Sequence, residues 1–137
     1  MDEKDHSHVT SFGYELIRDH VLTSILGKHE KDILYWAGKE LARKFPLYSM
    51  DEASSFFSEA GWGSLVLDKT TKDSAFYSLQ TVNLPSSGAS RSHRLEAGFL
   101  AEQQQKVGGF LTECYDEQVK KNGVVHFQIK WDLKSIK

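Results

Sequence analysis

Histidines, one cysteine and paired acids are the side chains of this sequence that could catalyse a reaction or bind a metal. No two histidines have the i, i+4 spacing around a carboxylate that a helical zinc site needs. Cys114 would need a neighbouring base and a lowered thiol pKa to act as a nucleophile, and the sequence indicates neither. The adjacent acids Asp51–Glu52 and Asp116–Glu117 point in different directions on a helix or strand. We therefore expect no enzyme, no metal site and no cofactor.

Aromatic and arginine side chains are the stronger pointer to function. Tyr and Trp join an apolar ring to a polar tip, which suits a pocket rim or a protein interface, although packing in the core is the alternative. Arg43 and Arg94 could hold a carboxylate of a ligand or of the protein, namely Glu96 or Glu102. The candidate ligand-binding or interface residues are Tyr14, Tyr35, Trp36, Arg43, Phe56, Phe57, Trp62, Arg94 and Phe99.

Size and charge limit the kind of protein. The 137 residues are the usual length of one domain, and a formal net charge of -2 with scattered Lys and Arg argues against a nucleic-acid partner. The single cysteine fits a reducing compartment. The first residues are polar and charged and are not followed by the apolar stretch of a secretory signal. No apolar run approaches the roughly 18 residues of a membrane span. We expect a cytoplasmic protein without a membrane span.

Three helices are expected in the first half to position these residues. Apolar residues recur near every fourth position over 12–26, before Gly27, and again over 33–45, before Pro46. The sequence Ser49-Met50-Asp51-Glu52 has the pattern of a capping box. The short helix it would open is expected to bury Ala53, Phe56, Phe57 and Ala60 and to end at Gly61.

The second half is dominated by strand patterns. Two alternating segments, 64–67 and 75–82, are separated by a polar turn and predict a hairpin. A loop over 83–93, a helix over 95–107 and a last strand over 125–131 follow. Residues 110–119 are ambiguous, and periodicity alone slightly favours a helix there. We expect a disordered arm over 1–9, one domain over 10–133 and a tail over 134–137.

Six short motifs in this order resemble the YslB-like family of uncharacterised bacterial cytoplasmic proteins, over about residues 10–133. They are Tyr35-Trp36-Ala37-Gly38-Lys39, Leu41-Ala42-Arg43-Lys44-Phe45-Pro46, Phe56-Phe57, Ala60-Gly61-Trp62-Gly63, the run from Leu95 to Gln103, and Ile129-Lys130-Trp131-Asp132. The family is distantly similar to a superfamily of vinyl-reductase-type ligand-binding domains, small subunits of the TRAPP tethering complex and haem nitric-oxide-binding domains. That resemblance implies an α+β fold, with helices packed on one face of a twisted antiparallel sheet of about four strands, and a strand within 110–119.

The resemblance carries no activity over to this chain. Members of the superfamily bind haem, small hydrocarbons or an acyl chain, or they dimerise. The paired cysteines of the vinyl-reductase type and the Tyr-x-Ser-x-Arg motif of the haem-binding type are both missing from this sequence. We expect a non-enzymatic module that binds a small apolar ligand in a pocket between helices and sheet and forms a homodimer. The alternative is a protein-interaction module without a ligand, for which a continuous exposed apolar patch would speak.

Overall fold

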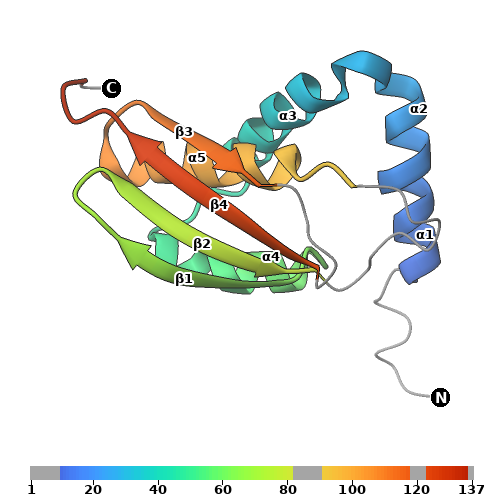
Figure 1. Cartoon of the computed structure of the whole chain (residues 1–137), viewed down its shortest axis with the longest axis horizontal. Helices are drawn as coiled ribbons and strands as arrows, with labels where there is room; N and C mark the ends of the chain where they lie inside the picture. The colour runs from blue at the N-terminus through green and yellow to red at the C-terminus, as the bar shows by residue number, and fades with distance from the viewer. Residues whose placement is uncertain (1–9, 82–90, 118–122, 136–137) are drawn as a thin grey trace.

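The computed structural model describes residues 10–81, 91–117 and 123–135, in which helices pack against a four-stranded sheet (Figure 1). An N-terminal helix consists of α1 (Ser11–Glu15), a π-helical segment η2 (Leu16–Val21) and α2 (Leu22–Leu26). The other helices are α3 (Glu30–Lys44), α4 (Ala53–Glu59) and α5 (Arg94–Gly108), with short 3-10 turns η3 (Gly27–His29) before α3 and η4 (Met50–Glu52) before α4.

The sheet is antiparallel throughout, in the order β1-β2-β4-β3. Its strands are β1 (Ser64–Thr70), β2 (Ser74–Gln80), β3 (Thr112–Asp116) and β4 (Val124–Trp131). In β4, Val125, Phe127 and Ile129 are buried, because alternate side chains face the helices. The predicted α+β fold, with the helices on one face of the sheet, is confirmed.

The ambiguous segment is a strand. β3 pairs with β4 so that Cys114 lies opposite Ile129, and both side chains are buried. Helical periodicity was the wrong guide here because Glu113 and Tyr115 face solvent on the far side of the sheet. The strand expected from the family resemblance is confirmed.

The helix pair α3 and α5 crosses at two glycines. A Cβ added to Gly38 would lie 2.1 Å from the carbonyl oxygen of Leu95, and one added to Gly98 would lie 2.0 Å from that of Tyr35. Only hydrogen at these two positions allows the backbones to approach so closely. The crossing therefore fixes α3 against α5, which is buried from Glu96 to Gln103.

Two local expectations differ from the structure. The capping box is wrong, because the Ser49 side chain makes no capping hydrogen bond and the Glu52 amide donates to the Ser49 carbonyl. The buried face of α3 is formed by Leu34, Gly38 and Ala42, whereas Phe45 of the predicted stripe is exposed. The predicted arm over 1–9 and most of the loop over 83–93 lie outside the described residues.

Candidate functional site

Four of the predicted binding residues belong to the core. Phe56, Phe57, Trp62 and Phe99 form one aromatic cluster between α4, α5 and the turn before β1. Phe56 stacks on Phe99 with ring centroids 4.4 Å apart, and Trp62 meets Phe57 edge to face at 4.9 Å. Phe57 and Phe99 are fully buried, so in this structure the cluster serves the packing of the core.

Tyr35 and Arg94 lie together at the free edge of β3. The Cys114 amide donates to the Tyr35 hydroxyl at 3.1 Å, and Arg94 Nη1 donates to the Cys114 carbonyl at 3.3 Å. The Arg94 guanidinium also lies 4.3 Å from the Tyr35 ring centroid and 2.6 Å from Asp116. Because these side chains satisfy the outward-facing backbone groups of Cys114, they close the edge against another strand.

Trp36 and Arg43 are surface residues of α3. The Trp36 side chain is 60% exposed. Arg43 forms ion pairs with Glu40 and with Glu102, the second at 3.3 Å. Glu102 is one of the two carboxylates that the sequence proposed as partners of Arg43 or Arg94. The other carboxylate, Glu96, pairs with a different arginine, Arg18.

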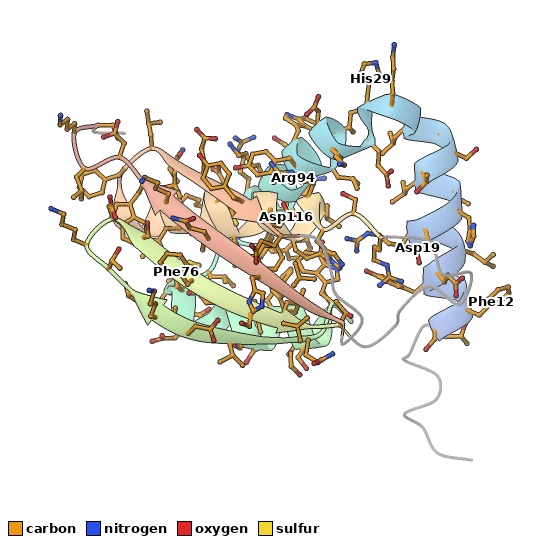
Figure 2. All side chains as sticks on the ribbon, in the orientation of Figure 1. Phe12, Asp19, His29, Phe76, Arg94 and Asp116 are labelled. Carbon is orange, nitrogen blue, oxygen red and sulfur yellow. The ribbon has the colours of Figure 1, made fainter. Side chains whose placement is uncertain are left out.

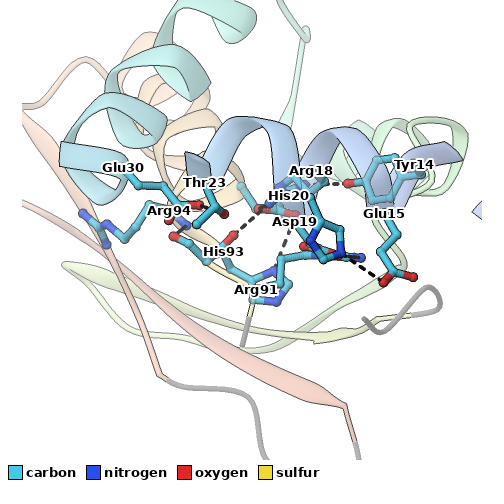
Figure 3. A network of polar contacts seen from close by, with 12 residues as sticks. Tyr14, Glu15, Arg18, Asp19, His20, Thr23, Glu30, Arg91, His93 and Arg94 are labelled. Carbon is cyan, nitrogen blue, oxygen red and sulfur yellow. Dashed lines mark hydrogen bonds and ion pairs between the residues drawn. The ribbon is translucent and has the colours of Figure 1, made fainter. Parts of the chain in front are cut away.

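Tyr14 belongs to a buried ionic network that joins the N-terminal helix to α5 (Figure 3). Arg18 donates to Tyr14 Oη at 2.5 Å, to the Ser92 carbonyl at 2.9 Å and to Glu96 Oε1 at 2.6 Å. Both Arg18 and Glu96 are almost completely buried. This ion pair is therefore screened little by water and depends on keeping both partners.

A second buried ion pair lies beside the first. Arg91 binds Asp19 in a bidentate manner, at 2.7 Å and 2.8 Å, and its guanidinium lies 5.0 Å from the Tyr14 ring centroid. Two adjacent residues of the N-terminal helix, Arg18 and Asp19, thus bind two different partners around α5. The helix is held in one orientation by these paired charges.

Burial alone would raise the pKa of Glu96, but the charge of Arg18 and the neighbouring His93 lower it to about 2. His93 Nδ1 lies 3.5 Å from Glu96 Oε2 and makes no hydrogen bond. Glu96 is therefore ionised in the folded protein at neutral pH.

The lowered pKa of Glu96 predicts a loss of stability in acid. Its contribution is complete above the ordinary pKa of 4.5, and it is lost as the pH falls from there to about 2. The free energy involved is about 3 kcal/mol. Denaturant unfolding at pH 7 and pH 3 should show the advantage of the wild type over Glu96→Gln shrinking by about 2 kcal/mol, because pH 3 lies between the two pKa values. An advantage that is the same at both pH values would contradict this assignment.

The N-terminal helix is inverted relative to an ordinary surface helix. It turns Glu15, Arg18 and Asp19 inward, where each is less than 10% exposed. Five apolar side chains on its outward side are 42–73% exposed: Phe12, Leu16, Ile17, Val21 and Ile25. We call these five residues the outward stripe. In Figure 2, Phe12 points away from the rest of the protein and Asp19 points toward it.

The π-helical segment η2 contributes to this arrangement. Within η2, Leu16 and Ile17 are both exposed and the next two residues, Arg18 and Asp19, are both buried. A π-helical turn holds more residues than an α-helical one, and such turns are often found at functional sites. The sequence analysis found the apolar periodicity of this helix but not that the apolar side faces outward.

The described residues line at least two hollows at the surface. The larger of these is a groove of about 810 Å³ beside β3, lined by residues of α3, α5, β3, β4, the turn between β1 and β2, and the segment after β4. The smaller measures about 210 Å³ and is lined mainly by charged side chains around His93 and Arg94. Between helices and sheet, the described residues of the aromatic cluster and its neighbours form the core.

Catalytic and metal-binding features are scarce in the described part of the chain. Burial raises the pKa of the Cys114 thiol, and nearby Asp116 raises it further, which disfavours the reactive thiolate. Within residues 10–81, 91–117 and 123–135, no three His, Cys, Asp or Glu side chains are placed to hold a metal ion. None of the described helices is long and apolar enough to cross a membrane.

Sequence reasoning missed the buried charges of the ionic network. One signal was available in the sequence of this helix. Glu96 interrupts a run from Leu95 to Ala101 that is otherwise apolar or small, and Glu102 and Gln103 follow it directly. A helix of that composition is buried on all sides, and its acids then require partners. The partner of Glu96, Arg18, lies 78 residues away in sequence, and the neighbouring Arg91–Asp19 pair spans 72 residues, so pairing them required the fold.

Solved structures with the same fold include a vinyl-4-reductase family protein and an H-NOX protein. A vinyl-4-reductase family protein from Methanocaldococcus jannaschii is 16% identical, with a TM-score of 0.65 over 91% of this chain and 83% of that one. A protein of the H-NOX family, described for its haem distortion, is 14% identical, with a TM-score of 0.57 over 95% of this chain and 75% of that one. At these identities the similarity shows the fold alone.

Sequence similarity identifies closer relatives. The uncharacterised protein YslB of Bacillus subtilis (strain 168) is 38% identical over 137 residues, which cover 98% of this chain and 93% of that protein. The family model described as "Protein of unknown function (DUF2507)" matches residues 11–130. This chain is therefore a member of the DUF2507 family, to which the YslB-like resemblance of its motifs had pointed.

Proposed function

We propose that this protein is a non-enzymatic docking module that pairs with a second copy of itself through the outward stripe. The observation that carries the proposal is the inversion of the N-terminal helix, with charges buried and apolar residues exposed. Buried ion pairs hold the inward side, so the helix cannot roll its apolar side onto its own domain without leaving Arg18 and Asp19 unpaired. A partner is then needed to cover the stripe.

The area and geometry of the stripe suit a helix pair. Its exposed apolar surface is on the order of 500 Å² per chain, near the largest patch of a typical monomer. Pairing two stripes would remove about 1,000 Å² from water, which reaches the lower limit for a specific interface before flanking contacts are added. Ile17, Val21 and Ile25 follow one another at spacings of four, and such ridges pack into the grooves of an identical helix.

The chemistry around the stripe favours a protein partner over a lipid surface. Helices that lie on membranes carry Lys and Arg along the polar side next to the apolar one. Here the exposed polar residues of the helix are Ser11, His20, Thr23 and Ser24, and its one arginine is buried. A neutral flank also removes the charge repulsion that two identical surfaces would otherwise feel.

A haem-binding function has less support. The H-NOX neighbour is described with haem, but the described residues here fill the space between helices and sheet with Phe57, Trp62 and Phe99. The hollow next to His93 is only about 210 Å³ and is lined by charges. These residues do not fit a haem.

A cytoplasmic location remains a prediction from the single cysteine.

Sedimentation of the full chain tests the proposal. The wild type should sediment as a dimer at micromolar concentration, and Ile17→Asp/Ile25→Asp should sediment as a folded monomer, because two buried carboxylates per chain would face one another. Ser55→Asp/Ser58→Asp adds the same charge on the exposed side of α4 and should remain dimeric. A wild-type monomer, or equal behaviour of the two variants, would reject self-association through the stripe.

A further inference from the structure

The groove along the free edge of β3 has an apolar floor that is open to solvent. Leu111 just before β3, Tyr115 on β3 and Leu133 after β4 line the groove and are 45–56% exposed. Trp131 lies beside them, and its Nε1 donates to the Lys72 carbonyl at 3.0 Å. The floor is thus formed by residues far from the outward stripe.

The end of the groove is built by a fixed turn. The Asp132 amide donates to the Leu111 carbonyl at 2.9 Å, and the Leu111 amide donates to Ser135 Oγ at 2.9 Å. Asp132 Oδ1 accepts from the Lys134 amide at 2.9 Å. The segment after β4, expected from sequence to be a tail, is therefore tied to the start of β3 as far as Ser135.

Four lysines surround this apolar floor: Lys39, Lys72, Lys130 and Lys134. Among the residues that the structure describes, no ion pair within 4.0 Å involves any of the four. Two of the three acids in the groove have other partners, since Asp73 accepts from Thr71 and Ser74, and Asp132 holds the turn. The third acid, Glu113, faces Lys130 across the strand pair without reaching it. With four lysines and three acids in its lining, the groove carries a formal charge of +1, and its lysines are not tied up in ion pairs among the described residues.

A β-strand does not suit this groove. The outward-facing amides of β3 already donate to side chains, Thr112 to Gln105 at 3.1 Å and Cys114 to Tyr35 at 3.1 Å. An added strand would find these backbone groups occupied. Recognition here must come from side chains.

We infer that the groove binds an amphipathic carboxylate, with its apolar body on Leu111, Tyr115 and Leu133 and its carboxylate among Lys72, Lys130 and Lys134. Apolar contacts supply area, and the ammonium groups supply the preference for an anion. The volume of about 810 Å³ is within the range of small-molecule sites. This site does not include the outward stripe, so ligand binding in the groove and self-association through the stripe can be tested independently.

Decanoate, used below its micelle-forming concentration, is a suitable probe. Its binding can be followed by amide NMR of the full-length protein. Shifts should concentrate at Leu111–Tyr115 and Trp131–Ser135. Lys72→Gln/Lys130→Gln/Lys134→Gln should weaken binding roughly tenfold or more, because the carboxylate loses nearby positive charge. Lys28→Gln/Lys44→Gln/Lys106→Gln changes the net charge equally on exposed lysines outside the groove and should bind as the wild type does. Glu113→Gln should tighten binding by removing the one unpartnered acid.

Decyltrimethylammonium provides the charge control. It has the same chain with a cationic head and should leave the groove unshifted. Equal binding of this cation, unchanged affinity in the groove-lysine variant, or shifts confined to the outward stripe would each overturn the site. Because the stripe variant Ile17→Asp/Ile25→Asp leaves the groove intact, its binding of decanoate should equal that of the wild type whether or not the chain dimerises.

Discussion

Gly98→Ala should lower the free energy of unfolding by about 3 kcal/mol, a large effect for one added methyl group. The added carbon would lie 2.0 Å from the Tyr35 carbonyl oxygen and 2.9 Å from its carbon. These are backbone atoms of α3, so relief requires the two helices to separate rather than a side chain to turn. Gly38→Ala meets the Leu95 carbonyl in the same way and should have an effect of similar size.

Gly108→Ala in α5 is the matched control for this prediction. Its added carbon would meet only the Gln104 side-chain amide, at 3.1 Å, which can move. Alanine is also the better helix former by about 1 kcal/mol. Urea unfolding followed by circular dichroism should therefore show little loss, or a gain, for Gly108→Ala. A similar loss for all three variants would mean that the α3–α5 crossing is looser than the structure shows.

Arg18→Met should destabilise the protein by about 3–5 kcal/mol, because it leaves the Glu96 carboxylate buried without its cation. The same substitution removes the hydrogen bonds to Tyr14 and to the Ser92 carbonyl. Glu96→Gln should also be destabilising, because it leaves the buried Arg18 guanidinium without its anion, although the amide oxygen can still accept from Arg18. Thermal and urea unfolding of the three proteins provide the comparison.

The double variant Arg18→Met/Glu96→Gln decides whether the cost comes from the unpaired charge. Once Glu96 is neutral, losing Arg18 should cost clearly less than it does in the wild type, so the two changes should not add. Additive effects would indicate that Arg18 stabilises the fold through its packing rather than through the pair. The N-terminal helix should also exchange its amide hydrogens faster in Arg18→Met than in the wild type, since its anchor is lost.

Much of the fold could be predicted because its patterns are local. The alternation of Val125, Phe127 and Ile129 predicts a half-buried strand, and Gly109 with a left-handed backbone ends α5 within one residue of the predicted helix over 95–107. The strand at Cys114 could not be decided by periodicity, since an edge strand exposes one face and leaves only two buried side chains to read. It took the family resemblance to predict it.

The functional surfaces were harder to predict because they depend on partners distant in sequence. The apolar period of the N-terminal helix is visible from Phe12 to Ile25, but periodicity does not say whether an apolar side faces the core or solvent. Its direction follows from Arg18 and Asp19, whose partners lie 78 and 72 residues away. The aromatic residues were candidates for a pocket, an interface or the core, and four of them pack the core.

Disulfide formation by Val21→Cys tests most directly whether two copies bring their outward stripes together. Val21 lies at the middle of the stripe, so it should approach its own counterpart across a two-fold axis. The native Cys114 is buried and should not compete. Mild oxidation should convert most of the Val21→Cys variant to a covalent dimer, whereas Ser58→Cys on α4 should remain monomeric. Denaturing electrophoresis without a reducing agent distinguishes the two outcomes. Equal, slow crosslinking of both variants would contradict the proposed helix pair.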